Sequence, residues 1–239
     1  MSKAYGGIDR FRIVAAFLIV GIHTYPLVSI SEDLNFGMIH VFARIAVPFF
    51  LMVTGYFVLS RKSIAGFLKK TALLYAGATI LYLPVSLYAG SYADGNIVVA
   101  VAKNIMFDGT FYHLWYLPAL MIGVLLIDAL SRRFSLHTIF GFTLGLYMLG
   151  LLGDSYYGIT EKIPLLKAVY DIAFHVFSYT RNGLFYAPVF LVMGAIMAKS
   201  EYQIKKQASL AAFAHGNQLS VTFHKETCAA SKEQACRRT

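Results

Sequence analysis

The sequence has few cysteines and few charged residues, and each scarcity excludes a class of protein. Its two cysteines, Cys228 and Cys236, both lie close to the C-terminus, so they provide neither a disulfide framework nor a metal site with proper ligand spacing. Charged residues make up only 14% of the chain, hydrophobic residues make up 58%, and the mean hydropathy is +0.61. Soluble domains do not sustain so positive a hydropathy, so the composition indicates an integral membrane protein.

Acidic residues are also scarce, with 12 Asp and Glu against 21 Lys and Arg, which gives a net charge of +9. In a membrane protein this excess reports on topology and does not indicate nucleic-acid binding. The chain shows no cleavable signal sequence, because residues 11–30 are too long for such a signal and no small-residue cleavage site follows them. We therefore expect the first apolar segment to stay in the mature protein.

Long hydrophobic runs are abundant, and they have the length of about twenty residues that crosses a hydrocarbon core. Helices are the expected form, because lipid offers no partner to an open strand edge. The sequence predicts an all-α, polytopic transmembrane helix bundle of about six spans, at residues 11–30, 38–59, 64–89, 114–131, 134–152 and 183–199. Residues 1–199 would form this transmembrane domain, and residues 200–239 a polar, poorly ordered cytoplasmic tail.

Basic residues are concentrated in every second loop. The basic segments contain Lys3, Arg10, Arg61, Lys62, Lys69, Lys70, Arg132, Arg133, Lys199, Lys205 and Lys206. Because cytoplasmic loops carry the excess of Lys and Arg, both termini of this multi-pass cell-membrane protein are predicted to be cytoplasmic. In the long outward loop, the apolar spacing of residues 165–177 predicts a short helix on the membrane surface.

The first apolar run contains two ionisable side chains, Arg12 and His23, which lie eleven positions apart. At about 100° per residue both face the same side of a helix, separated by a rise of about 16 Å. Arg12 could extend to the headgroups as a topology anchor, and His23 could be a hydrogen-bonded packing residue. Ionisable groups inside a membrane are nonetheless functional candidates, and histidine can act as a base near neutral pH.

Arg44 adds a third costly side chain about two turns into the second span, at a depth similar to that of His23. Pro48 follows one turn later and frees backbone groups nearby. The pattern favours a polar cavity shared by Arg44 and His23, whereas the alternative is that Arg44 reaches the outer headgroups.

A further cluster, "FYHLWYLPALMIG", lies at the outer end of the fourth span and contains His113, Trp115 and Tyr116. An interfacial aromatic belt explains Trp115 and Tyr116 without any specific function. Histidine is not typical of that belt, so His113 is a candidate site residue.

Four segments together resemble the acyltransferase-3 family of membrane acyltransferases. They are "GIDRFRIVAAFLIVGIHTYP", which carries Asp9, Arg12 and His23, then "VPFFLMVTGYFV", "FYHLWYLPAL" and "TRNGLFYAPVFLVMGAIMA". The resemblance extends over residues 7–199. Within the family, "YHLWYLPAL", "GDSYYG" and "TRNGLFYAP" look closest to the membrane portion of VanT-type membrane-bound serine racemases, which are associated with vancomycin resistance.

The resemblance implies transfer of an acyl group other than an aminoacyl group, from cytoplasmic acyl-CoA to an extracytoplasmic hydroxyl acceptor in the cell envelope. His23 would be the general base, and Arg12, beside Asp9, would hold the donor by charge-assisted hydrogen bonds. No metal is expected. The residues expected to contact substrate are Arg44, His113, Trp115 and Arg181. Lys69 and Lys70 are expected to attract the CoA donor, in addition to their ordinary role in setting the topology.

Two alternatives stay open. The first is a membrane domain for L-serine uptake without chemistry, in which a buried cation and an acceptor would bind the zwitterion. The second is an inactive truncated fragment, because family members have more spans than this chain offers. The sequence has no room for a pyridoxal phosphate barrel and no lysine motif for one, so we expect neither pyridoxal phosphate nor racemase activity.

The predicted topology can be tested by labelling single engineered cysteines from outside the cell. A probe near Tyr156 should react with an impermeant thiol reagent, and one near Arg132 should react only after the membrane is permeabilised. The opposite pattern would invert the orientation and the side on which the donor binds.

Overall fold

The computed structural model describes residues 5–60, 63–89, 101–111 and 113–204, and all of its regular structure in these ranges is helical. The chain divides into two compact units, residues 1–197 and 198–239. The described part of the second unit, residues 198–204, is helical. The all-α prediction is confirmed for the described residues. The expected disorder of the tail falls almost wholly outside them, and the domain boundary at residue 199 stays a prediction.

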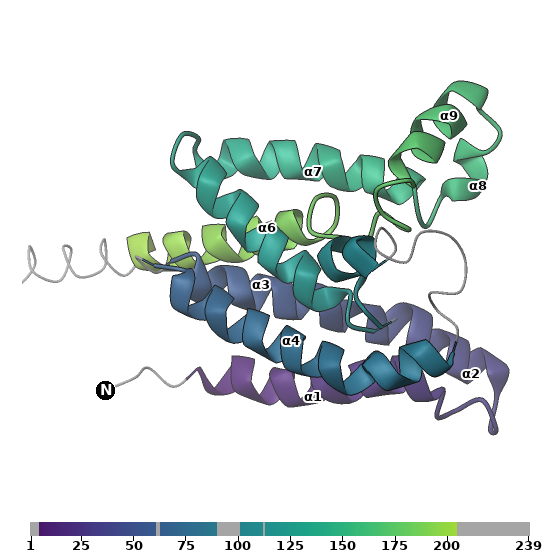
Figure 1. Ribbon diagram of the computed structural model, residues 1–239. Helices are drawn as coiled ribbons and strands as arrows, with labels where there is room; N and C mark the ends of the chain where they lie inside the picture. The colour runs from purple at the N-terminus through teal and green to yellow at the C-terminus, as the bar shows by residue number, and fades with distance from the viewer. Residues whose placement is uncertain (1–4, 61–62, 90–100, 112, 205–239) are drawn as a thin grey trace, which may run out of the picture. The chain divides into compact units, whose positions relative to one another are not determined.

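Helices occupy the six places that the apolar runs predict. In the first unit they are α1 (Gly6–Thr24), α2 (Glu32–Phe36), η1 (Gly37–Phe42), η2 (Ala43–Ile45), α3 (Ala46–Val58), α4 (Ala65–Tyr88), η3 (Asn104–Asp108), α6 (Tyr116–Ser131), α7 (Leu136–Leu152), α8 (Tyr157–Thr160) and α9 (Pro164–Ala173), followed by a helix over residues 187–197. α1 packs along α3, and α4 packs along α6 (Figure 1). α9 is the helix expected within residues 165–177, and its location at a membrane surface stays a prediction.

The first helix ends earlier than its apolar run suggests. Tyr25 adopts a left-handed conformation with φ 48° and ψ 53°, and its N–H donates to the carbonyl of Gly21, which closes the helix after Thr24. Pro26 follows and cannot continue a helical hydrogen-bond ladder. His23 therefore lies in the last turn of α1 and not in the middle of a span that reaches residue 30.

The second helix is continuous from Glu32 to Val58 but changes its winding near Arg44. A π-helical segment, η1, is followed by the 3₁₀ segment η2, which contains Arg44, before α-helical winding resumes in α3. Pro48 has no N–H to offer the carbonyl of Arg44, one turn earlier, so an ordinary ladder cannot form there. π segments within helices are frequent at functional sites.

Length and composition identify fewer membrane spans than the sequence predicts. Among the described residues one helix, Glu32–Val58, is long and apolar enough to cross a membrane, and two shorter apolar helices occupy Tyr116–Ser131 and Leu136–Leu152. These criteria also admit core helices of soluble proteins, so they do not by themselves decide the class of protein. The count of six spans stays a prediction.

The core of the first unit lies where α3, α6 and the helix over residues 187–197 meet. Leu51, Val124, Ile127 and Leu191 are almost completely buried there. Large apolar side chains also point outward from the other helices: Phe17 on α1 is 73% exposed and Leu81 on α4 is 71% exposed. Such faces are typical of helices that contact lipid.

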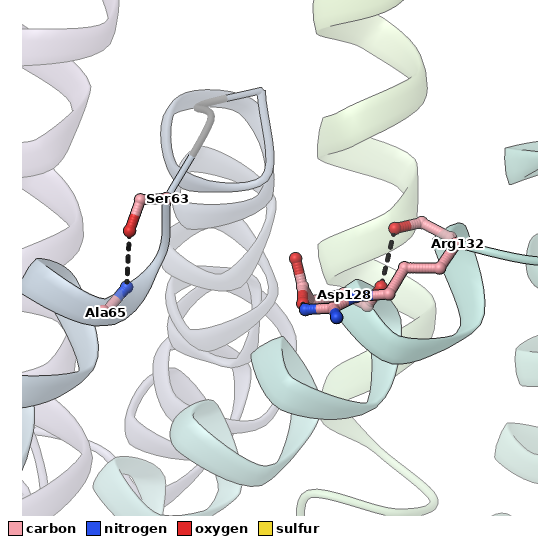
Figure 2. A network of polar contacts seen from close by, with 5 residues as sticks. Ser63, Ala65, Asp128 and Arg132 are labelled. Atoms are coloured by element: carbon pink, nitrogen blue, oxygen red, sulfur yellow. Dashed lines mark hydrogen bonds and ion pairs between the residues drawn. The ribbon is translucent and has the colours of Figure 1, made fainter.

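Polar contacts between residues close in sequence stabilise the helix ends that adjoin the basic loops. Arg132 Nη2 and Asp128 Oδ2 form an ion pair, 2.6 Å apart, at the end of α6. Figure 2 shows the Arg132 side chain extending back to Asp128, and the hydrogen bond of Ser63 with Ala65 at the start of α4. Ser63 Oγ accepts a hydrogen bond from the Ala65 N–H at 3.4 Å. Ser135 likewise caps α7 by accepting from the Thr138 N–H at 3.2 Å. These caps satisfy N–H groups that a helix start leaves without a helical partner.

Two glycines allow α3 and the helix over residues 187–197 to approach closely. A Cβ at Gly55 would overlap the carbonyl oxygen of Leu191, and a Cβ at Gly194 would overlap that of Met52. Both obstacles are backbone atoms, which cannot move as a flexible side chain can. Small residues at such crossings are the usual means by which membrane helices pack tightly.

Gly55→Ala should therefore destabilise the bundle by about 1–3 kcal/mol or more, because the added methyl forces the two helices apart. Gly77→Ala is the matched control, since a Cβ at Gly77 on α4 meets nothing within 4 Å. Thermal unfolding in detergent, followed by loss of the monodisperse peak in size-exclusion chromatography, measures both variants. Equal melting temperatures for the two would contradict the close packing.

Candidate functional site

The two ends of α1 carry different parts of the predicted site. Asp9 and Arg12 lie near its start and His23 lies in its last turn, so they are separated by about 16 Å along the helix axis. Arg12 Nη1 donates to Asp9 Oδ1 at 2.7 Å, and the Arg12 guanidinium lies over the Phe57 ring, 5.4 Å from its centroid. Both contacts hold the Arg12 cation beside α1 and the end of α3.

At the other end of α1, the structure brings two predicted site residues together. The ring centroids of His23 and His113 are 5.8 Å apart. Tyr82 and Phe111 each present their rings edge-on to His113 at 5.0 Å. Burial, and next the neighbouring His23, lower the pKa of His113. The pair therefore combines an imidazole that stays neutral at neutral pH with a second imidazole beside it.

A sharply turned segment carries His113. Gly109 has φ 83°, and a Cβ there would overlap the backbone of Leu114 and Trp115, so only glycine permits this turn. The buried Asp108 carboxylate accepts the Ser178 N–H with Oδ1 at 2.9 Å and Oδ2 at 3.0 Å. The Tyr179 hydroxyl donates to the Asp108 carbonyl. These bonds tie the His113 segment to the segment that precedes Arg181.

Arg181 is held between charge and aromatic rings. Its Nε lies 2.9 Å from Asp154 Oδ2. Its guanidinium carbon lies 5.9 Å from the centroid of Trp115 and 5.4 Å from that of Tyr179. The side chain is half exposed, so the guanidinium can contact both a substrate and its protein neighbours.

Arg44 approaches the same region from the second helix. Arg44 Nη2 lies 3.3 Å from His40 Nδ1, one turn away. Tyr186 interacts electrostatically with both Arg44 and Arg181, and its ring lies edge-on to Trp115 at 5.9 Å. Of the predicted substrate residues, Trp115 thus contacts Tyr186, and Arg44 and Arg181 act on it electrostatically.

The remaining predicted residues lie at the opposite end. Lys69 and Lys70 are exposed in the first turns of α4, which begins where α3 has ended, near Phe57 and Arg12. The structure therefore separates Asp9, Arg12 and the two lysines from the His23–His113 pair. In the described ranges, no group of three His, Cys, Asp or Glu side chains could hold a metal ion.

Sequence reasoning missed several residues that build this region. They are His40, Tyr82, Asp108, Asp154 and Tyr186. A spacing of four from Arg44 could have indicated His40. The loop carboxylates resembled ordinary surface charges, and nothing in the sequence distinguished their contacts.

These observations define the class of protein. It is a helical bundle with outward apolar faces, and ionisable groups lie at both ends of its first helix. Comparison with known proteins then gives the family. The chain belongs to the acyltransferase-3 family, whose acyltransferase domain matches residues 5–214. Family membership identifies this helical bundle as a membrane protein, as the composition predicts, and the predicted family resemblance is confirmed.

Curated relatives are racemases of enterococci. An amino-acid racemase of Enterococcus faecalis is 43% identical over 211 residues, which is 86% of this chain and 30% of the relative. A serine/alanine racemase of Enterococcus gallinarum is 36% identical over 203 residues, 81% of this chain and 29% of the relative. The chain thus spans less than a third of the length of these relatives, as expected of a VanT-type membrane portion. No solved structure matches the chain.

The Asp108 contact gives a prediction for the region's stability. Asp108→Ala should lower the free energy of unfolding by about 1–3 kcal/mol, because it leaves the Ser178 N–H without its acceptor. Asp171→Ala is the control, since the ion pair of Asp171 with Lys167 is exposed to solvent and should contribute little to stability. Thermal unfolding in detergent should separate the two variants. A similar small decrease for both would show that Asp108 does not hold the segment.

Proposed function

We propose that this chain is an acyltransferase domain that moves an acyl group from cytoplasmic acyl-CoA to an extracytoplasmic hydroxyl acceptor. The observation that supports this proposal most directly is the His23–His113 pair. The pair lies at the C-terminal end of α1, which the predicted topology places outside the cell. Hydroxyl acylation needs a group that accepts a proton near neutral pH, and imidazole is suited to that task.

In the proposed reaction, His23 accepts the proton of the acceptor hydroxyl as its oxygen attacks the thioester carbon of the donor. A carbon–oxygen bond forms, the carbon–sulfur bond breaks, and the proton passes from His23 to the departing CoA thiolate. The lowered pKa of His113 keeps that ring neutral, so it does not repel the proton on His23. The aromatic edges of Tyr82 and Phe111 orient the His113 ring.

The donor side of the proposal uses the other end of the bundle. Arg12, oriented by its hydrogen bond to Asp9, and the exposed Lys69 and Lys70 would attract the phosphates of CoA. Because Arg12 lies about 16 Å from His23 along the helix, one small group cannot contact both. An extended donor, with its phosphates at the basic end and its thioester at His23, matches this separation.

A second candidate function is L-serine uptake. One relative is named a serine/alanine racemase, and this chain resembles a region of it that is 29% of its length. Arg44 and Arg181 could bind the carboxylate of an amino acid, and Asp154 its ammonium group. The racemase activity of the whole relatives is not proposed for this chain.

His23 variants test the acyltransferase proposal. His23→Ala and His23→Gln should both abolish acyl transfer from radiolabelled acyl-CoA, because neither side chain titrates near neutral pH. Arg12→Lys should retain partial activity, since it keeps the charge but loses the planar fork. His137→Gln, on an exposed histidine of α7, is the matched control and should leave the rate unchanged.

The same membranes should be assayed for serine uptake, and the equivalent substitutions should be made in a longer relative that contains the whole site. Full acyl transfer by His23→Gln in that relative would remove His23 from the mechanism. Uptake that depends on Arg44 and Arg181, with no acyl transfer by the unsubstituted proteins, would favour transport.

A further inference from the structure

One face of α4 consists of hydroxyl side chains. Thr71, Tyr75, Thr79, Tyr82 and Ser86 follow one another at spacings of three and four, so they form a single stripe along the helix. Thr71, Tyr75 and Ser86 are buried, and the other two are partly buried. The opposite face of α4 is apolar and exposed, as Leu73 at 64% and Ile80 at 72% illustrate. α4 therefore turns its polar face toward the protein.

Three members of this hydroxyl stripe contact the segment that leads to His113. Tyr75 Oη lies 3.3 Å from the Asn104 carbonyl oxygen and 3.1 Å from that of Ile105, to which it donates, and it accepts the Thr110 N–H at 3.3 Å. The Thr79 and Thr110 hydroxyl oxygens are 2.8 Å apart. Ser86 Oγ donates to the Thr110 carbonyl at 3.3 Å. The Tyr75 hydroxyl thus bonds the backbone at both ends of the segment, at residues 104–105 and at Thr110.

The segment requires such partners because its backbone does not follow an ordinary helix. Residues 104–108 are π-helical, and Gly109 turns the chain with a positive φ. Asp108 and Thr110 are buried, so the polar backbone groups there need partners within the protein. Tyr82, the fourth member of the stripe, contacts the His113 ring directly.

We propose that Tyr75 is a positioning residue: its hydroxyl, supported by Thr79 and Ser86, holds residues 104–111 so that the His113 ring stays beside the His23 ring. Its effect on acyl transfer rests on the proposed function. Its effect on the position of His113 does not, so the two can be tested separately.

The position of His113 can be measured by cross-linking. In a background with Cys228→Ser and Cys236→Ser, the substitutions His23→Cys and His113→Cys provide two thiols for a short bifunctional methanethiosulfonate. Adding Tyr75→Phe should lower the cross-linking rate about fivefold, the change in population expected when one typical hydrogen bond is lost. Tyr88→Phe is the matched control, because the Tyr88 side chain lies on the same helix and is 95% exposed.

Equal rates for Tyr75→Phe and Tyr88→Phe would overturn the proposal. Thr79→Val provides a milder second variant, which removes one hydroxyl without changing the side-chain shape, and it should lower the rate by a smaller factor. If both Tyr75→Phe and Thr79→Val instead disappear from the membrane fraction, the stripe stabilises the bundle and the proposal is equally wrong.

The rate of acyl transfer measures the part of this proposal that depends on the proposed function. In the chain with both histidines, Tyr75→Phe should lower kcat for acyl transfer and leave the KM for acyl-CoA unchanged, because the donor phosphates bind at the opposite end. A lowered cross-linking rate, together with no acyl transfer by the chain that keeps both histidines, would contradict the proposed function and leave the positioning role intact. A raised KM with unchanged kcat would contradict a role at the His23–His113 pair.

Discussion

The requirement that irregular backbone be satisfied by the protein itself shapes the whole site. The buried carbonyls of a π turn and the buried N–H groups of a sharp bend cannot rely on water for hydrogen bonds. Here the segment that carries His113 is such a stretch, and it is bonded from two sides. Tyr75, Thr79 and Ser86 of α4 contact one side, and the Asp108 carboxylate connects the other side to Ser178.

This double attachment links parts of the chain that the proposed chemistry needs together. The same Asp108 that anchors the His113 segment also receives the Tyr179 hydroxyl on its carbonyl, two residues before Arg181. The positions of His113 and Arg181 are therefore coupled through one buried residue. Toward the other end of α3, close packing through Gly55 and Gly194 joins that helix to the helix over residues 187–197.

Much of the fold follows from the length and hydrophobicity of its runs. Helices appear at all six predicted places, because a run of about twenty apolar residues has few alternatives to a helix in a membrane. The end of α1 could not be predicted in this way, since hydropathy continues to Ile30 and does not register the left-handed conformation of Tyr25. Nor could the π-helical winding of η1, because Pro48 indicates only that the hydrogen-bond ladder is interrupted near Arg44.

The sequence predicted many of the individual site residues, but it did not predict which of them contact one another. The depth of Arg12, His23 and Arg44 along apolar runs, and a histidine in an aromatic cluster, gave most of the candidates. The pairing of His23 with His113 joins distant parts of the chain through a turn that only Gly109 allows, so no local pattern indicates it. The loop carboxylates Asp108 and Asp154 were missed because their partners lie on other elements.

The central claim is that His23 and His113 form one proton-handling pair. The most direct measurement is a pH titration of the imidazoles by nitrogen NMR, on histidine-labelled protein in nanodiscs, with and without His23→Gln. Because burial and the charge of His23 both lower the pKa of His113, that ring should titrate below the usual range of histidine, and the His23→Gln variant should raise its pKa. A His113 that titrates normally and is unaffected by the substitution would contradict the account.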